Sequence, residues 1–132
     1  MSNSLRDKVV VVTGASSGIG RSIALESASR GATVILMARH QDKLEEIANE
    51  ARQLSGNEVY VFPTDISKAD QIDRAFNEIV SHVDHIDYLV NAAGFGVFKE
   101  FLETSPQVMT EMFQTNVLGL MCFTRLVARV MI

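Results

Sequence analysis

The sequence predicts an α/β fold, a doubly wound parallel sheet with helices on both faces. Two observations lead to this prediction. Strand-like and helix-like segments alternate strictly along the chain, in the order β-α-β-α-β-α-β-α. The strand-like segments are largely apolar, as strands that are covered on both faces are. The chain has no internal repeat or linker, so we expect all 132 residues to belong to one domain.

The predicted strands are short runs rich in β-branched and aromatic residues. They are Val9–Val12, Val34–Met37, Val59–Phe62 and Ile86–Val90.

The segments between the strands have the periodicity of helices. The first helix is expected to begin near Gly18 and to stop at Gly31, with an inner face made of Ile19, Ile23, Ala24 and Ala28. The second is expected over 42–54. The third is expected to run from the Ser67-Lys68-Ala69-Asp70 segment to about Val80, with Ser67 and Asp70 capping its free N–H groups.

A last helix is predicted after the fourth strand, with Ser105 as its cap and Pro106 in its first turn. Its apolar pattern continues to Ile132, where no glycine, asparagine or proline stops it. We therefore expect the fold to be truncated after the fourth strand and its following helix.

Composition gives no sign of a nucleic-acid or membrane protein. The net charge is −4 with a pI near 5.3, and no apolar stretch approaches the ~20 residues of a membrane span. Cys122 is the single cysteine and cannot form an internal disulfide, which favours a reducing, cytoplasmic compartment. Its neighbours Met121 and Phe123 predict that its thiol is buried. The histidines, at positions 40, 82 and 85, do not have the pattern of a metal site.

A glycine-rich turn, Gly14-x-x-x-Gly18-x-Gly20, joins the first strand to the first helix. Gly14 permits a tight turn, Gly18 leaves room for a ligand, and Gly20 lets helix and strand approach closely. The free N–H groups and the dipole of the helix favour a pyrophosphate there, with Ser16 and Ser17 as added donors. The alternative is a glycine-rich turn without a ligand.

The end of the second strand indicates which dinucleotide would bind. A free ribose 2′-hydroxyl usually meets Asp or Glu about twenty residues beyond the turn, where this chain has Ala38 and then Arg39. A guanidinium holds a 2′-phosphate through paired hydrogen bonds, so Arg39, with His40 and Lys43 nearby, favours NADP(H) over NAD(H). The alternative is a solvated charge at the start of a helix.

Two further polar residues are singled out by their positions. Asp65, after the third strand, can accept a hydrogen bond from an adenine amino group or help to cap the next helix. Asn116 lies on the apolar stripe of the last helix, four residues from Met112 and from Leu120, and is expected to be buried with partners. Those partners can be the backbone groups of a distorted helical turn.

Taken together, these segments resemble the short-chain dehydrogenase/reductase family. The matching segments are TGASSGIG at 13–20, Arg39, Asp65-Ile66, NAAG at 91–94 and Asn116 in TNVLG. The resemblance implies a Rossmann-type sheet with strand order 3-2-1-4-5-6-7. It also implies hydride transfer between NAD(P)(H) and a small carbonyl or alcohol substrate.

The resemblance also implies roles for individual residues. The pyrophosphate and its ribose would be surrounded by Gly14, Ser16, Gly18, Ile19 and Gly20. Arg39 would take the 2′-phosphate, and Asp65 with Ile66 the adenine. The segment near the nicotinamide ribose would be Asn91, Ala92, Ala93 and Gly94, where Ala92 departs from the more frequent NNAG. Asn116 would help to hold a proton-relay water, and its helix would pack against a second copy in a homo-oligomer.

The family's acid–base group is a Tyr followed four residues later by Lys, with a Ser about a dozen residues before the Tyr. Here Tyr60 is followed at that spacing by Thr64, and Tyr88 by Ala92. We therefore expect this chain to carry the cofactor-binding half of a reductase, with Phe95–Phe98 as at most one apolar wall of the substrate pocket. The alternative is a non-catalytic half-domain that binds a dinucleotide or a partner. A flavodoxin-like FMN protein would leave Arg39, NAAG and Asn116 unexplained.

Overall fold

A parallel sheet forms the centre of the molecule. The computed structural model describes residues 4–94 and 100–132, and within them the sheet has four strands in the order β3-β2-β1-β4. The strands are β1 (Val9–Thr13), β2 (Thr33–Ala38), β3 (Val59–Pro63) and β4 (Tyr88–Asn91). The predicted parallel α/β architecture is confirmed, with strand boundaries shifted by one or two residues.

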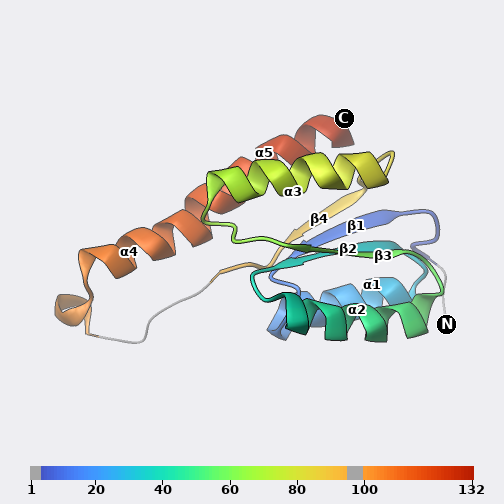
Figure 1. Cartoon of the computed structure of the whole chain (residues 1–132), viewed down its shortest axis with the longest axis horizontal. Coiled ribbons are helices and arrows are strands. Elements are labelled where there is room, and N and C mark those ends of the chain that lie inside the picture. Colours follow the sequence, from blue (N-terminus) through green and yellow to red (C-terminus); the bar gives the residue numbers. More distant parts are fainter. Residues whose placement is uncertain (1–3, 95–99) are drawn as a thin grey trace.

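Helices cover both faces of the sheet (Figure 1). Helices α1 (Gly18–Ser29) and α2 (Gln41–Ser55) lie on one face, and α3 (Ala69–His82) and α5 (Leu120–Met131) lie on the other. This arrangement is the doubly wound fold that the alternating pattern predicts.

Each face of the sheet has its own apolar core because side chains alternate along a strand. Val10 and Val12 of β1 belong to the core beneath α1 and α2, whereas Val9 and Val11 belong to the core beneath α3 and α5. All of β1 is buried, as the continuous valine run predicts. Strand β4 differs, since its residues are half-buried or exposed and Tyr88 is 48% exposed.

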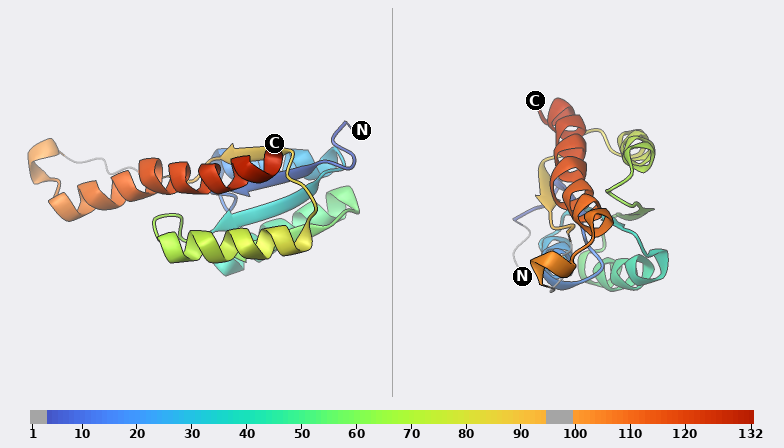
Figure 2. Two further views of the ribbon diagram at one scale, coloured as in Figure 1. Left: turned by 90° about the horizontal axis from the view of Figure 1, so that it is seen from above. Right: turned by 90° about the vertical axis from the view of Figure 1, so that its left-hand side faces the viewer.

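The last helical segment is interrupted. After a short 3₁₀ turn at Phe101–Glu103, helix α4 (Pro106–Phe113) begins as predicted, with the backbone N–H of Val108 donating to Ser105 Oγ at 3.2 Å. A π-helical turn over Gln114–Gly119 then leads into α5. Helix α5 packs on the sheet, whereas α4 extends beyond it (Figures 1 and 2).

Gly119 lies where the π turn contacts the loop between β3 and α3. A Cβ at this position would overlap the carbonyl oxygen of Ile66, in the loop between β3 and α3. The glycine therefore permits close contact between the π turn and that loop.

Two predicted core positions are wrong. Ile19 is 75% exposed because it lies in the first turn of α1, beside the glycine turn, whereas Ala24 and Ala28 are fully buried. Cys122 is exposed because the inner face of α5 is set by Phe123 and Val127, both 0% exposed, and the cysteine lies about 100° away from Phe123 around the helix.

No helix within residues 4–94 and 100–132 combines the length and the apolar character needed to cross a membrane.

The two neighbouring residues of α5 give a matched test of this packing. Phe123→Ala removes a fully buried ring, so we expect it to lower the free energy of unfolding by about 3–5 kcal/mol. Cys122→Ala changes an exposed side chain, and we expect a change within about 0.5 kcal/mol. Urea unfolding of both variants measures the difference; equal midpoints would show that the assigned faces of α5 are wrong.

Candidate functional site

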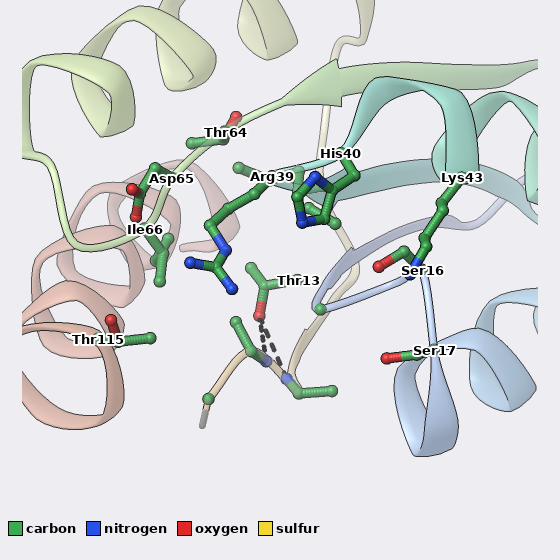
Figure 3. Close-up of a pocket in the computed structure, with 16 residues that line it drawn as sticks. Thr13, Ser16, Ser17, Arg39, His40, Lys43, Thr64, Asp65, Ile66 and Thr115 are labelled. Carbon is green, nitrogen blue, oxygen red and sulfur yellow. Dashed lines mark hydrogen bonds between the residues drawn. The ribbon is translucent and has the colours of Figure 1, made fainter. Parts of the chain in front are cut away.

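A pocket of about 300 Å³ opens at the carboxyl ends of the strands. Its walls come from the ends of β1 and β2, the segments that follow all four strands, Lys43 of α2 and Thr115 of the π turn (Figure 3). The lining residues are Thr13, Gly14, Ser16, Ser17, Met37, Ala38, Arg39, His40, Lys43, Thr64, Asp65, Ile66, Ala92, Ala93, Gly94 and Thr115. Because the strand order reverses at β1, the pocket lies where ligands bind in open α/β sheets.

The glycine-rich turn has the backbone geometry that its sequence predicts. Gly14 and Gly18 have φ of +62° and +56°, in the left-handed region that favours glycine. A Cβ on Gly20 would overlap the carbonyl of Gly14, whereas a Cβ on Gly18 would meet nothing within 4 Å. Gly20 thus serves the close packing of strand and helix, and open space remains beside Gly18.

The N-terminus of α1 is suited to an anion. Ser17 occupies the N-cap position, but its side chain makes no capping hydrogen bond, and the first turn of α1 contains no acidic residue. The free N–H groups and the positive end of the helix dipole are therefore not neutralised by a nearby carboxylate of that turn. Ser16 and Ser17 line the pocket, whereas Gly18, Ile19 and Gly20 lie outside its lining.

Thr13 connects the glycine turn to the segment after β4. Its hydroxyl, on a residue only 3% exposed, accepts hydrogen bonds from the backbone N–H groups of Ala92 and Ala93, at 3.2 Å each. Asn91 turns away from this contact, since its side-chain Nδ2 donates to Thr124 Oγ1 of α5 at 3.0 Å. Ala92, Ala93 and Gly94 therefore line the pocket, while Asn91 joins β4 to α5.

Arg39, His40 and Lys43 bring basic side chains to the β2 side of the pocket. Figure 3 shows the Arg39 guanidinium reaching into the pocket and the Lys43 side chain running toward Ser16. Lys43 belongs to the first turn of α2, whereas Arg39 and His40 precede that helix. The cluster therefore lies beside the glycine turn, where a phosphate group can meet both.

Asp65 lies in the loop after β3, the strand next to β2, and its side chain lies near Arg39 (Figure 3). Its Oδ1 accepts hydrogen bonds from the backbone N–H of Ser67 at 3.0 Å and from Ser67 Oγ at 2.7 Å. The prediction that Ser67 caps α3 is wrong, because its hydroxyl bonds to Asp65 and the N-cap position is Lys68.

The surroundings of Asp65 favour its ionised form. Burial of the carboxyl raises its pKa, but the hydrogen bonds from Ser67 and the charges of Arg39 and Lys68 outweigh burial, so that the pKa is lowered below its usual value. Asp65 therefore acts only as an acceptor near neutral pH.

Asn116 lies in the π turn and is half-buried rather than buried. A Cβ on Gly94 would be 2.9 Å from Asn116 Oδ1, so the amide lies against the end of the NAAG segment. Asn116 lines an adjacent apolar groove with Met109, Met112 and Phe113, while its neighbour Thr115 lines the main pocket. The π turn lies near the end of the sheet rather than over its centre (Figure 2), which leaves Asn116 incompletely buried.

Sequence reasoning missed four residues of the pocket: Thr13, Met37, Thr64 and Thr115. Thr13 and Met37 lie at strand ends, where their position next to the predicted turns could have indicated them. Thr115 depends on the π turn, for which the helical pattern gives no signal. The predicted apolar wall, Phe95–Phe98, lies outside the described residues.

The lowered pKa of Asp65 makes a prediction about acid stability. A depressed pKa means that the stabilisation is complete above the unfolded-state value, about 3.9, and is lost as pH falls through the folded-state value. We expect the difference in unfolding free energy between wild type and Asp65→Asn to be constant above about pH 5 and to shrink as the pH is lowered further.

Asp73→Asn, which removes an exposed carboxylate of α3, is the matched control for the loss of one charge. Urea unfolding at a series of pH values measures both differences. A wild type–Asp65→Asn difference that stays constant down to about pH 3 would contradict the assigned electrostatics.

Comparison with known proteins agrees with this geometry. The family model described as short chain dehydrogenase matches residues 8–132. The chain is 39% identical over 125 residues to 11-beta-hydroxysteroid dehydrogenase 1A of Arabidopsis thaliana, covering 94% of this chain and 36% of that protein. It is 44% identical over 93 residues to 11-beta-hydroxysteroid dehydrogenase A of Sesamum indicum, covering 70% and 27%. The chain thus spans about a third of the length of these relatives.

Solved structures give the same result. L-sorbose reductase from Gluconobacter frateurii, complexed with NADPH and L-sorbose, superposes with a TM-score of 0.92 at 30% identity, covering 99% of this chain and 50% of that one. The alcohol dehydrogenase of Thermococcus sibiricus, complexed with 5-hydroxy-NADP, has a TM-score of 0.88 at 37% identity, covering 93% and 52%. With its glycine turn, its pocket and a family match over nearly its whole length, this chain belongs to the short-chain dehydrogenase family.

Proposed function

We propose that the protein is an NADP(H)-dependent oxidoreductase that transfers hydride to or from a carbonyl or alcohol substrate, and that this chain carries its cofactor-binding part. The observation that carries the proposal is the placement of Arg39, His40 and Lys43 in the same pocket as the glycine turn. The proposal is supported by the two solved structures above, whose names include NADPH and 5-hydroxy-NADP.

The residues of the pocket fit such a cofactor from end to end. Ser16, Ser17 and the N-terminus of α1 would hold the pyrophosphate, because donors and dipole both favour negative charge there. Arg39 would pair with the 2′-phosphate, with Lys43 adding positive charge.

The adenine and the nicotinamide would lie toward β3 and β4, which are the two edge strands of the described sheet. Asp65 would accept a hydrogen bond from the adenine amino group, with Ile66 as an apolar contact. Ala92, Ala93 and Gly94 would approach the nicotinamide ribose, held in place by the Thr13 hydroxyl. Asn116, against Gly94, would then lie close to the reacting end of the cofactor.

The bound cofactor would supply or accept the hydride, and the chain would orient it at the carboxyl edge of the sheet. We propose that the acid–base group lies outside residues 1–132, since neither Tyr60 nor Tyr88 has a lysine four residues later. The similar proteins carry names of a sorbose reductase and of hydroxysteroid dehydrogenases, so the proposed substrate class is a carbonyl or alcohol without further definition.

The role of Arg39 can be tested by substitution. Arg39→Ala removes a charged partner of the 2′-phosphate, so we expect the affinity for NADPH to fall roughly 10–100-fold. The affinity for NADH, which has no 2′-phosphate, is expected to stay within about threefold of the wild-type value. Titration of the full chain with each cofactor, followed by cofactor fluorescence, measures both constants.

Arg74→Ala, on the exposed surface of α3 and outside the pocket lining, is the control for the loss of an arginine. The assignment of Arg39 fails if Arg39→Ala weakens NADPH and NADH equally. Tighter binding of NADH than of NADPH by the wild type would contradict the proposed cofactor preference.

We also propose that the protein forms a homo-oligomer through the helix that carries Asn116. Phe113, Val117 and Met121 are spaced four residues apart on this helix and are 55%, 36% and 59% exposed. Such a stripe of apolar side chains suits contact with a second copy of the same helix.

A charge placed on this stripe tests the proposed interface. We expect Met121→Glu to shift the protein toward monomer because two carboxylates would be brought together in an apolar contact. Leu102→Glu, at a residue 95% exposed but off the stripe, is expected to leave the oligomeric state unchanged. Sedimentation velocity of both variants measures the shift; a wild type that sediments as a monomer would refute the interface.

A further inference from the structure

Almost all of the polar groups of Asp65 make hydrogen bonds within the chain. Its carbonyl oxygen accepts from the backbone N–H of Lys68 at 3.0 Å, and its Oδ1 accepts twice from Ser67. Its own backbone N–H donates to the side-chain Oε1 of Gln71 at 2.7 Å. Within the described part of the chain, the remaining acceptor of Asp65 is therefore carboxylate oxygen Oδ2.

Gln71 makes its contact from outside the pocket lining. It lies in the first turn of α3, in the position where a side chain commonly reaches back to the N-cap residue. Here it reaches beyond the N-cap, Lys68, to Asp65. A backbone N–H needs an acceptor, so the amide oxygen rather than the nitrogen must face it.

This contact joins the pocket loop to a rigid element. Helix α3 is packed on the sheet through Ile72, Ala75 and Ile79, all 5% exposed or less. Ser67 sets the direction of the Asp65 carboxylate, but Ser67 belongs to the same loop as Asp65. The Asp65 carbonyl is bonded to Lys68, the N-cap of α3, and Gln71 ties the Asp65 backbone N–H to a residue within the packed helix. Such support fixes a binding side chain in its working geometry.

We propose that Gln71 is a positioning residue that sets the selectivity of the pocket for adenine by holding Asp65 in place. The inference rests on the proposed function, in which Asp65 faces the adenine of the cofactor. With its backbone fixed by Gln71 and its Oδ1 occupied by Ser67, Asp65 presents Oδ2 as an acceptor to the adenine amino group. Hypoxanthine has a carbonyl oxygen at this place, so two acceptors would face each other without a proton between them.

The test compares two cofactors that differ only at this group. NADPH and reduced nicotinamide hypoxanthine dinucleotide phosphate are titrated into the full chain, and the ratio of their dissociation constants is the readout. We expect the wild type to bind NADPH roughly 10–100-fold more tightly than the hypoxanthine analogue. In Gln71→Ala we expect the ratio to fall to about threefold or less.

The ratio separates positioning from a general loss of structure. A variant that is merely destabilised weakens both cofactors together and leaves their ratio unchanged, and an unchanged ratio in folded Gln71→Ala would overturn the inference. Gln71→Met, which keeps the length of the side chain without the acceptor, serves if the alanine variant does not fold. It is expected to lose the selectivity as well.

Two further variants sharpen the result. Gln71→Glu keeps an acceptor oxygen, so it is expected to retain the wild-type ratio, and loss of the ratio in this variant would count against the proposed hydrogen bond. Gln53→Ala, at an exposed glutamine of α2, is the control and is expected to change nothing.

A double variant tests whether the effect of Gln71 on the ratio of dissociation constants requires Asp65. In an Asp65→Ala background, Gln71→Ala is expected to have no further effect on the ratio, because it acts through Asp65. A further fall would overturn the inference. A wild type that binds neither cofactor refutes the proposed function itself, whereas tight NADPH binding with a ratio insensitive to Gln71 refutes the positioning role alone.

Discussion

The geometry of the pocket depends on the hydrogen bonds that the Thr13 hydroxyl accepts from the segment after β4. Two backbone N–H groups, of Ala92 and Ala93, donate to one buried oxygen at the end of β1. Unsatisfied donors in such a place are costly, so the NAAG segment is fixed against the strand. The same segment packs against the glycine turn, since a Cβ on Gly14 would collide with the backbone of Ala92. The glycine turn and the NAAG segment, which follow the neighbouring strands β1 and β4, are therefore held against each other.

The pocket brings basic side chains together in a protein whose net charge is negative. The chain has a net charge of −4, yet the proposed ligand carries several negative charges. Attraction therefore has to be local, from the N-terminus of α1 and from Arg39 and Lys43. Asp65 is tolerated in this pocket because Ser67 and the nearby cations stabilise its charge. The pocket thus has a cationic part and a carboxylate part, which gives an asymmetric ligand one preferred orientation.

The sequence was sufficient for features that depend on local chemistry. The strands follow from short runs of β-branched, aromatic and other apolar residues. The glycine turn follows from glycines at positions where the backbone has positive φ or where strand and helix pack closely. Ser105 was found as a cap because capping depends on neighbouring residues alone. The prediction for Ser67 is wrong because its hydroxyl has two possible local partners, and it donates to Asp65 instead of capping α3.

Features that depend on how segments meet could not be predicted in the same way. The burial of Phe123 and the exposure of Cys122 depend on which side of α5 faces the sheet, and both residues continue the same apolar pattern. Thr115 enters the pocket because of the π turn. Gln71 gave no signal, since an amide in the first turn of a helix is common and its partner lies in the preceding loop.

The π turn at Gln114–Gly119 also determines how α4 and α5 tolerate changes in length. A π turn contains one more residue than the α-helical turn it replaces, and one residue corresponds to about 100° of helix rotation. A single-residue deletion within 114–119 would restore a regular helix and leave α4 in nearly the same rotation relative to α5, because the wider π turn absorbs its extra residue. The deletion would still change the places of Thr115 and Asn116 within the turn. A one-residue insertion in α4, where the helix is regular, would instead rotate the residues before it by about 100°. Changes in length are therefore accommodated at the π turn rather than evenly along the helix.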